Sequence, residues 1–142
     1  MKKQILEVLA VCAFFILSAD FSFAQCDSIA SLCARHISKQ FISDGQQYRA
    51  LLLNTEETAE FHSTFYGGST YRVAACSGLK DGNLIFSVFD SERNLLYTNN
   101  DYRNAPYWDF KITSTIDCII EAKLDVSSQG SGCAVVLIGF KQ

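Results

Sequence analysis

The chain has 142 residues, of which 49% are hydrophobic and 19% are charged, and its formal net charge is −3 at pH 7. This length suits a single domain with one core. The charges are spread without long runs of either sign, so the sequence offers no electrostatic footprint for nucleic acid or for an anionic membrane surface, and it excludes both as partners.

Residues 1–24 have the pattern of a secretory signal peptide. Two lysines precede the apolar run ILEVLAVCAFFIL, and small residues stand at Ser22 and Ala24, where a signal peptidase reads them. We therefore expect cleavage after Ala24. Residues 25–142 would then form one exported domain, in the periplasm or outside the cell.

Two other fates for this segment are disfavoured. A retained membrane anchor would need roughly 20 apolar residues, whereas this run is shorter and contains Glu7. A lipoprotein would need a small residue before Cys26, and Gln25 stands there. We expect no stable membrane insertion of the mature chain.

The first element predicted in the mature chain is an amphipathic helix over about residues 27–42. Its apolar residues recur at i, i+3, i+4, i+8 and i+12, which are Ile29, Leu32, Cys33, Ile37 and Phe41. Asp27 or Ser28 can cap the start of this helix, and Gly45 in SDG suits a left-handed exit from it.

After Gly45 the hydrophobic pattern changes to the alternation of β-strands. The strand-like runs are residues 47–53, 59–66, 71–76, 84–90, 95–98, 108–113, 118–124 and 133–140. Turn sequences such as YGGST, KDGN and SSQGSG separate neighbouring runs. The last run, CAVVLIGF, is apolar on both faces, which is typical of a central strand or of one covered by the helix. The pattern predicts a mainly β fold, an antiparallel β-sandwich of about eight strands with one N-terminal helix.

Three segments follow the order of elements found in a known family: STYRVAACSG, NLIFSVFDSERNLLYTNND and CIIEAKLDVSSQGSGCAVVLIGF. In the spacing of these strands and turns, residues 58–140 resemble the bacterial pre-peptidase C-terminal domain and related GOLD-like jelly rolls. The resemblance implies a jelly-roll β-sandwich that acts as an accessory or binding module, and it supplies no catalytic residues.

Export sets the redox state of the cysteines. Cys12 would leave with the signal, and five would remain: Cys26, Cys33, Cys76, Cys118 and Cys133. An oxidising compartment favours disulfides, and because five is odd, at least one thiol must be free or pair between chains.

The disulfide pairing is constrained by the predicted elements. If Cys26 and Cys33 are both helical, they lie about 10 Å apart along the axis, beyond the reach of a disulfide. Counting the ends of strands that alternate in direction places Cys76 and Cys133 at one end of the sandwich and Cys118 at the other. We therefore expect a Cys76–Cys133 bridge.

The only two histidines limit the catalytic chemistry of the chain. His36 follows Cys33 by three residues, so the two could form a thiolate–imidazolium pair on one helix face. A helix packing its apolar stripe on the sheet explains the same spacing, and we prefer that interpretation. His62 alternates with Phe61 and is expected to face solvent or the less buried face. We expect no enzymatic activity, with a small hydrolase or thiol enzyme as the disfavoured alternative.

Two metal hypotheses arise from the composition of the loops and the helix. Zinc could use Cys26, Cys33, His36 and a strand cysteine, but the spacing matches no known zinc finger and disulfides compete for the thiols, so we expect no zinc. Calcium could use oxygen ligands at loop tips, which are Asp81, Asn83, Asp90, Asn99 and Asp101. The same residue types serve ordinary turns, so calcium stays an alternative to having no cofactor.

The stretch YTNNDYRNAPYWDF, residues 97–110, is richer in aromatic residues and longer than a hairpin needs. Trp108 is expected to begin a strand and to face the core. This leaves Tyr102, Arg103 and Tyr107 as candidate contacts for a ligand, although a purely structural crossover explains the stretch as well.

These observations predict an exported, non-catalytic binding or accessory module that recognises a glycan, a peptide or a cell-surface polymer. The alternative is a structural or assembly protein of the cell envelope, which would use a sheet edge or the odd cysteine to join other chains.

Overall fold

The computed structural model describes residues 21–127 and 132–142. The helical elements are α2 (Phe21–Cys33) and the 3-10 helices η1 (Ala34–His36) and η2 (Asn99–Tyr102). The strands are β1 (Ile42–Leu52), β2 (Thr58–Phe65), β3 (Thr70–Cys76), β4 (Leu84–Asp90), β5 (Leu95–Thr98), β6 (Tyr107–Lys111), β7 (Ile116–Leu124) and β8 (Gly132–Lys141). Among the described residues, no helix has both the length and the apolar character needed to cross a membrane.

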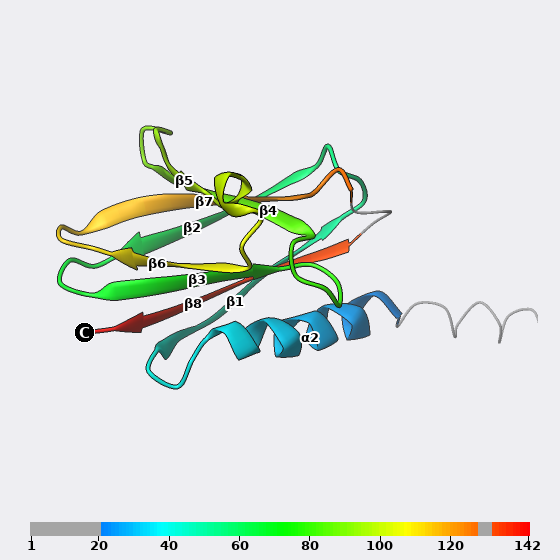
Figure 1. Ribbon diagram of the computed structural model, residues 1–142, viewed down its shortest axis with the longest axis horizontal. Coiled ribbons are helices and arrows are strands. Elements are labelled where there is room, and N and C mark those ends of the chain that lie inside the picture. The colour runs from blue at the N-terminus through cyan, green and yellow to red at the C-terminus, as the bar shows by residue number, and fades with distance from the viewer. Residues whose placement is uncertain (1–20, 128–131) are drawn as a thin grey trace, which may run out of the picture.

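The strands form two four-stranded sheets, and every strand pair is antiparallel (Figure 1). The strand order is β1-β8-β3-β6 in one sheet and β2-β7-β4-β5 in the other. The chain therefore crosses between the sheets in the order of a jelly roll. This confirms the predicted mainly β, jelly-roll-like sandwich with one N-terminal helix.

The main core lies between the two sheets, and alternation along each strand fills it. In β4, for example, Leu84, Phe86 and Val88 are almost fully buried while the residues between them are only partly covered. Residues at every second position of a strand point to one face, so this pattern directs one face of β4 into the sandwich. The fully buried large side chains include Phe65, Phe86, Leu84 and Ile120.

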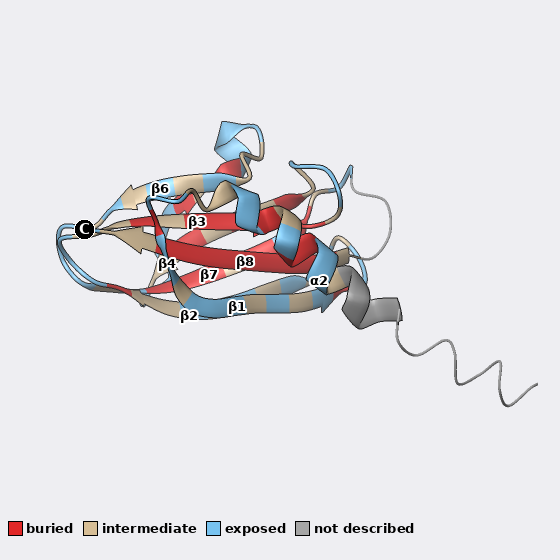
Figure 2. Cartoon of the chain, turned by 90° about the horizontal axis from the view of Figure 1, so that it is seen from below, coloured by how far each residue is buried: buried red, intermediate tan, exposed pale blue. Residues whose placement is uncertain are grey.

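A second, smaller core lies between α2 and the outer face of the β1-β8-β3-β6 sheet. Figure 2 shows α2 crossing β8 and β3 on that face. This core contains Ile29, Ala30 and Cys33 of the helix with residues of β3 and β8. Strand β8 thus lies between β1 and β3 and is also covered by the helix, so both explanations offered for its apolar run apply.

The helix is shorter than predicted, and this part of the prediction was wrong. It ends at Cys33, η1 follows, and residues 42–45 belong to β1, where the register shifts between Ser43 and Gln47. The apolar positions Ile37 and Phe41 are nevertheless covered by the sheet, because Gly139 has no side chain to hold them away. A Cβ at Gly139 would lie only 3.0 Å from Phe41 Cβ.

Gly45 does adopt the expected left-handed backbone, with φ at 80°. It does so inside the irregular start of β1 rather than at a helix exit. The expected cleavage after Ala24 would fall within α2. The mature helix would then begin at Gln25, immediately before a cysteine that is anchored to the sheet.

Two disulfides fasten the helix to the sandwich, and they correct the predicted bridge. Cys26 is bonded to Cys133 of β8, and Cys33 to Cys76 of β3. The strand count correctly placed Cys76 and Cys133 at one end of the same sheet. Both side chains, however, belong to the core beneath α2, so the two helix cysteines are their partners. Cys118 is the remaining thiol of the described residues, free and buried in the main core.

Candidate functional site

The aromatic stretch predicted to contain a recognition loop folds as the end of β5, the 3-10 helix η2 and the start of β6. Thr98 caps η2, since its Oγ1 accepts a hydrogen bond from the Asn100 N–H at 3.4 Å. The turn after η2 contains two residues with left-handed backbone, Arg103 (φ 56°) and Asn104 (φ 53°). The excess length of the stretch is thus used to turn the chain from one sheet to the other.

Asn99 holds this turn against the sandwich and is fully buried. Its Oδ1 accepts a hydrogen bond from the Phe86 N–H at 2.9 Å, and its Nδ2 donates to the carbonyls of Leu84 and Ala105 at 3.0 Å each. Both ends of the buried amide are occupied by backbone groups. Asn99 is therefore a structural residue, and its role as a calcium ligand stays a prediction.

The other predicted calcium ligands do not converge on one position. Asp81 and Asn83 lie in the β3–β4 loop and Asp101 lies in η2, whereas Asp90 ends β4, about 20 Å along that strand from Asn83. The carboxylate of Asp90 accepts hydrogen bonds from the Asn94 side chain and from the N–H groups of Asn94 and Glu92, which lower its pKa. Asp90 thus serves the β4–β5 turn. A calcium site near the β3–β4 loop or η2 stays a prediction.

The structure does not bring Tyr102, Arg103 and Tyr107 together into one surface. The ring of Tyr102 lies 4.4 Å from that of Trp108. Tyr107 instead stacks under the Arg72 guanidinium, whose Cζ lies 4.3 Å from the centroid of the Tyr107 ring. The ring of His36 is its other neighbour. Adjacent residues of a strand point to opposite faces, so Tyr102 and Tyr107 pack on opposite faces of β6. Their role in binding stays a prediction.

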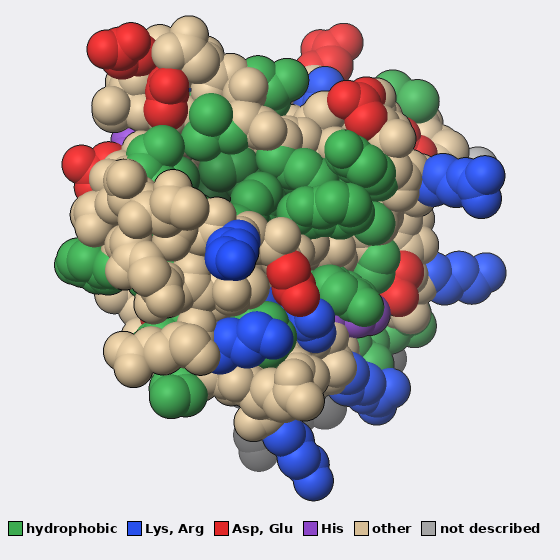
Figure 3. All heavy atoms as spheres, turned by 60° about the vertical axis from the view of Figure 1, so that its left-hand side comes forward, with side chains coloured by type: hydrophobic (Ala, Val, Ile, Leu, Met, Phe, Trp, Pro, Cys, Tyr) green, Lys and Arg blue, Asp and Glu red, His purple; other side chains and the backbone are tan. Residues whose placement is uncertain are grey.

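Hydrophobic side chains gather on the side of the molecule that carries β5, η2 and β6 (Figure 3). Tyr97 forms the base of this group, with ring contacts to Tyr102, Trp108 and Phe110. Its burial raises the pKa of its hydroxyl to about 12, with smaller contributions from Tyr102 and Asp101. The aromatic residues of the stretch thus act first as packing between β5 and β6.

Trp108→Ala is expected to lower the free energy of unfolding by about 3 kcal/mol, the lower end of the range for large buried aromatics. The side chain is only partly buried, but it contacts both Tyr97 and Tyr102. Arg103→Ala, at an exposed position of the same turn, is the matched control and should change stability by less than about 0.5 kcal/mol. Denaturant unfolding measures both, and equal stability of the two variants would contradict this packing role.

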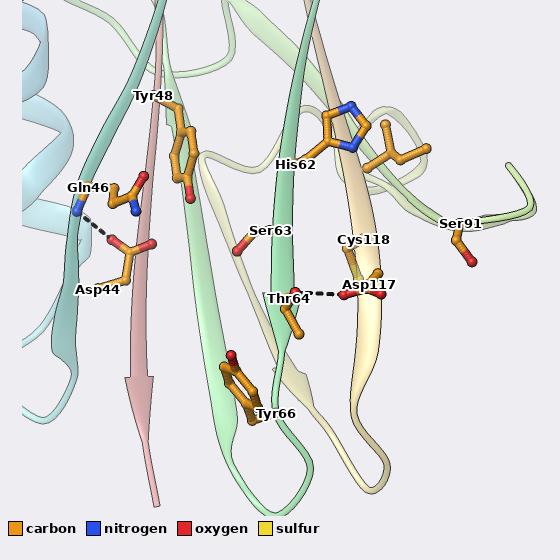
Figure 4. Close-up of a pocket in the computed structure, with 11 residues that line it drawn as sticks. Asp44, Gln46, Tyr48, His62, Ser63, Thr64, Tyr66, Ser91, Asp117 and Cys118 are labelled. Atoms are coloured by element: carbon orange, nitrogen blue, oxygen red, sulfur yellow. Dashed lines mark hydrogen bonds between the residues drawn. The ribbon is translucent and has the colours of Figure 1, made fainter.

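A cleft of about 670 Å³ opens on the opposite side of the sandwich, where β1 and β2 are the edge strands of their sheets (Figure 4). It is lined by residues of β1, of β2 and the turn after it, of the β4–β5 turn and of β7. These are Asp44, Gln46, Tyr48, His62, Ser63, Thr64, Tyr66, Ser91, Asp117, Cys118 and Ile119. The cleft follows the edge of β2, and side chains on both faces of β2 line it.

Hydrogen bonds fix the polar groups of this cleft. Thr64 Oγ1 donates to Asp117 Oδ1 at 2.6 Å across the β2–β7 pair, and the Gln46 N–H donates to Asp44 Oδ1 at 2.9 Å (Figure 4). His62 Nε2 lies 2.8 Å from Glu60 Oε1, and Glu60 also pairs with Arg93. The position of His62 on the exposed face agrees with the sequence prediction.

The cleft is acidic. Its described lining contains Asp44 and Asp117 but no lysine or arginine. Partial burial raises the pKa of Asp44, and the hydrogen bond from Gln46 opposes this only in part. An Asp whose charge is poorly solvated is stabilised by a nearby cation, so the chemistry of the cleft suits a ligand that carries positive charge.

The cysteine–histidine pair considered from the sequence has no free thiolate here, because Cys33 is in a disulfide. His36 Nε2 lies 3.0 Å from Asp81 Oδ1 instead. Cys118, the one free thiol of the described residues, reaches the cleft lining, but burial raises its pKa to about 11, with smaller contributions from Asp117 and Asp90. It is therefore protonated at neutral pH and is a poor nucleophile.

Sequence reasoning missed this cleft, although it recognised the strands that form it. Tyr48, Thr64 and Asp117 look like ordinary members of alternating strands, and none stands in a motif. Their convergence depends on β1 and β2 both being edge strands, which the strand order of the sheets decides. The signal that was present is the row of polar residues on β2.

Comparisons with known proteins give no family and no function. No family model and no curated protein matches the chain. Among solved structures, it is similar to Aeromonas hydrophila PliG, a periplasmic lysozyme inhibitor of g-type lysozyme, with a TM-score of 0.52 and 14% identity. That match covers 73% of this chain and 90% of PliG.

A second similar structure is the pre-peptidase C-terminal domain of a collagenase from Bacillus anthracis, with a TM-score of 0.47 and 9% identity. This match covers 66% of this chain and 87% of that domain. The weak resemblance to such domains that the sequence suggested is thus also found among solved structures. At 14% identity the likeness to PliG describes the fold alone.

Proposed function

We propose that the mature chain is an exported, non-catalytic accessory module that binds an extended, basic segment of a partner protein along β2. The observation that carries this proposal is an acidic cleft that lies along the edge strand β2. The two disulfides of the structure suit an exported chain.

The backbone of β2 supports the choice of an extended ligand. Along its length β2 pairs only with β7 among the described strands, so its other edge faces the opening beside β1. A free strand edge presents unpaired N–H and C=O groups that an incoming strand can pair with. The side chains of such a strand would reach the cleft alternately from both faces of β2.

The charges support the choice of a basic ligand. Asp44 and Asp117 lie on the two sides of β2 in Figure 4. A lysine or arginine of the ligand would find a carboxylate on either side, and the exposed ring of Tyr66 could stack on its charged group. PliG, whose fold is similar, is an inhibitor of a lysozyme, so its partner is also a protein.

Other classes of function receive less support. Cys33 is bonded and the pKa of Cys118 is high, so a thiol enzyme lacks a nucleophile in the described part of the chain. Covalent assembly through the odd cysteine is disfavoured because Cys118 is only 3% exposed. A glycan remains the rival ligand, since hydroxyl groups and tyrosines line the same cleft.

The mature, oxidised protein is expected to bind lysine- or arginine-containing peptides on an array. The double variant Asp44→Asn/Asp117→Asn should bind them at least roughly tenfold more weakly, because charge-assisted contacts are lost. Asparagine keeps the acceptor that Thr64 uses. Asp101→Asn, which removes a carboxylate outside the cleft lining, is the control and should bind like the wild type.

The same experiment includes a glycan array and a g-type lysozyme as a protein probe. Binding of glycans alone would make the cleft a sugar site and would refute a peptide ligand. Equal affinities of the cleft variant and Asp101→Asn would refute the cleft as the site. Peptide affinity should also fall as acid protonates Asp44, at a higher pH than for an ordinary aspartate because its pKa is raised.

A further inference from the structure

A second group of side chains has the composition of a metal site, and none of its residues lines the cleft. One ligand atom each from His36, Cys76 and Asp81 lie within 4.8 Å of one another. His36 ends η1, Cys76 ends β3, and Asp81 lies in the β3–β4 loop. Two regions distant in sequence, η1 and the end of β3 with the loop after it, thus bring an imidazole, a sulfur and a carboxylate together.

A fourth ligand is bonded directly to this group. Cys33 forms the disulfide with Cys76, so reduction of that bond would place two thiols beside His36 and Asp81. Two thiolates, an imidazole and a carboxylate are ligands that zinc accepts in tetrahedral sites, whereas thiolates do not suit calcium or magnesium. Zinc and the disulfide would therefore compete for the same two sulfur atoms, those of Cys33 and Cys76.

The surroundings favour retention of this geometry after reduction. Cys33 is fully buried in the core beneath α2, and Cys76 is 7% exposed. The helix packs on β3 and β8 through Ile29 and Ala30 as well as through its cysteines. On the outer side, Asp81 is exposed and the His36 side chain is partly exposed, which leaves a route for an ion.

We propose that the Cys33–Cys76 disulfide and a bound zinc ion are alternative states of this one site. A dithiol reductant supplies two electrons and two protons, becomes a disulfide itself, and leaves Cys33 and Cys76 as thiols. Zn²⁺ then displaces both thiol protons to solvent and is bound by the two thiolates, His36 and Asp81. A two-electron oxidant that re-forms the disulfide expels the ion. This inference goes beyond the proposed function and does not depend on it.

The test uses the full mature protein, reduced with a water-soluble phosphine that is oxidised to its oxide with oxygen from water. After removal of the phosphine under nitrogen, Co²⁺ serves as the probe, because thiolate-bound cobalt has an intense charge-transfer absorption. The reduced protein should bind one Co²⁺, which Zn²⁺ displaces. The oxidised protein should show no such absorption.

Matched variants separate this site from the other thiols, which reduction also frees. His36→Asn and Asp81→Asn should each weaken cobalt binding at least about tenfold, the loss expected even for residues that only support a ligand. His62→Asn and Cys118→Ser should bind like the wild type. If reduction unfolded the chain, cobalt would bind loose thiols and the His36 and Asp81 variants would have no effect. That result, or an absence of binding, would overturn the proposal.

Discussion

Replacing Cys26 and Cys133 together by serine is expected to lower the free energy of unfolding by about 4 kcal/mol. The bond closes a loop with a sequence separation of 107, so its loss releases a large amount of chain entropy in the unfolded state. It also detaches the start of α2 from β8. Denaturant unfolding of the oxidised variant, with the Cys33–Cys76 bond intact, measures the effect.

The control is the other disulfide. The Cys33→Ser/Cys76→Ser variant opens a loop with a sequence separation of 43, and the entropic model predicts a loss smaller by about 1 kcal/mol. Wild-type protein under reducing conditions should be less stable than either double variant. A Cys26/Cys133 variant as stable as the wild type would mean that the apolar contacts and the Cys33–Cys76 bond hold the helix without the first disulfide.

Asn99→Ala is expected to destabilise the protein by about 3 kcal/mol. The substitution leaves the Phe86 N–H and the carbonyls of Leu84 and Ala105 without their partner in a fully buried position. Unpaired buried polar groups cost about 1–3 kcal/mol each, and part of that cost is recovered if water enters.

Asn100→Ala is the neighbouring control, because Asn100 is exposed and contributes only its backbone N–H to the cap of η2. Thermal and denaturant unfolding should place it within about 0.5 kcal/mol of the wild type. Similar losses in the two variants would show that the turn is weakened as a whole and that the buried amide has no special role.

The sequence predicted the architecture because alternation is a local property. Runs such as LIFSVFD and CAVVLIGF show in their own residues whether one face or both are buried, and the structure confirms both interpretations. The helix end was harder to predict. Phe41 is buried and Ile37 partly buried, as their spacing indicated, but they contact the sheet from the bends and turn that follow η1. Gly139, distant in sequence, leaves the space that they occupy.

The disulfides and the candidate site depend on contacts that spacing alone cannot supply. Cys76 and Cys133 were correctly placed at one end of a sheet, yet their partners are decided by the helix that lies over them. The cleft likewise exists because β1 and β2 end their sheets on the same side. Tyr102 and Tyr107 appeared as neighbours in a loop. In the structure Tyr102 contacts Trp108 on one face of β6, and Tyr107 contacts Arg72 on the other face.

The most direct test of the central claim, that β2 and its cleft form the binding site, is hydrogen–deuterium exchange of the mature protein. Exchange is compared without ligand and with the basic peptide that binds best on the array. We expect slower exchange confined to β2 and the adjoining part of β1, because the bound strand pairs with the free edge of β2 and covers β1 beside it. Protection of β5 and β6 instead, or no change in β2 at saturating peptide, would contradict it.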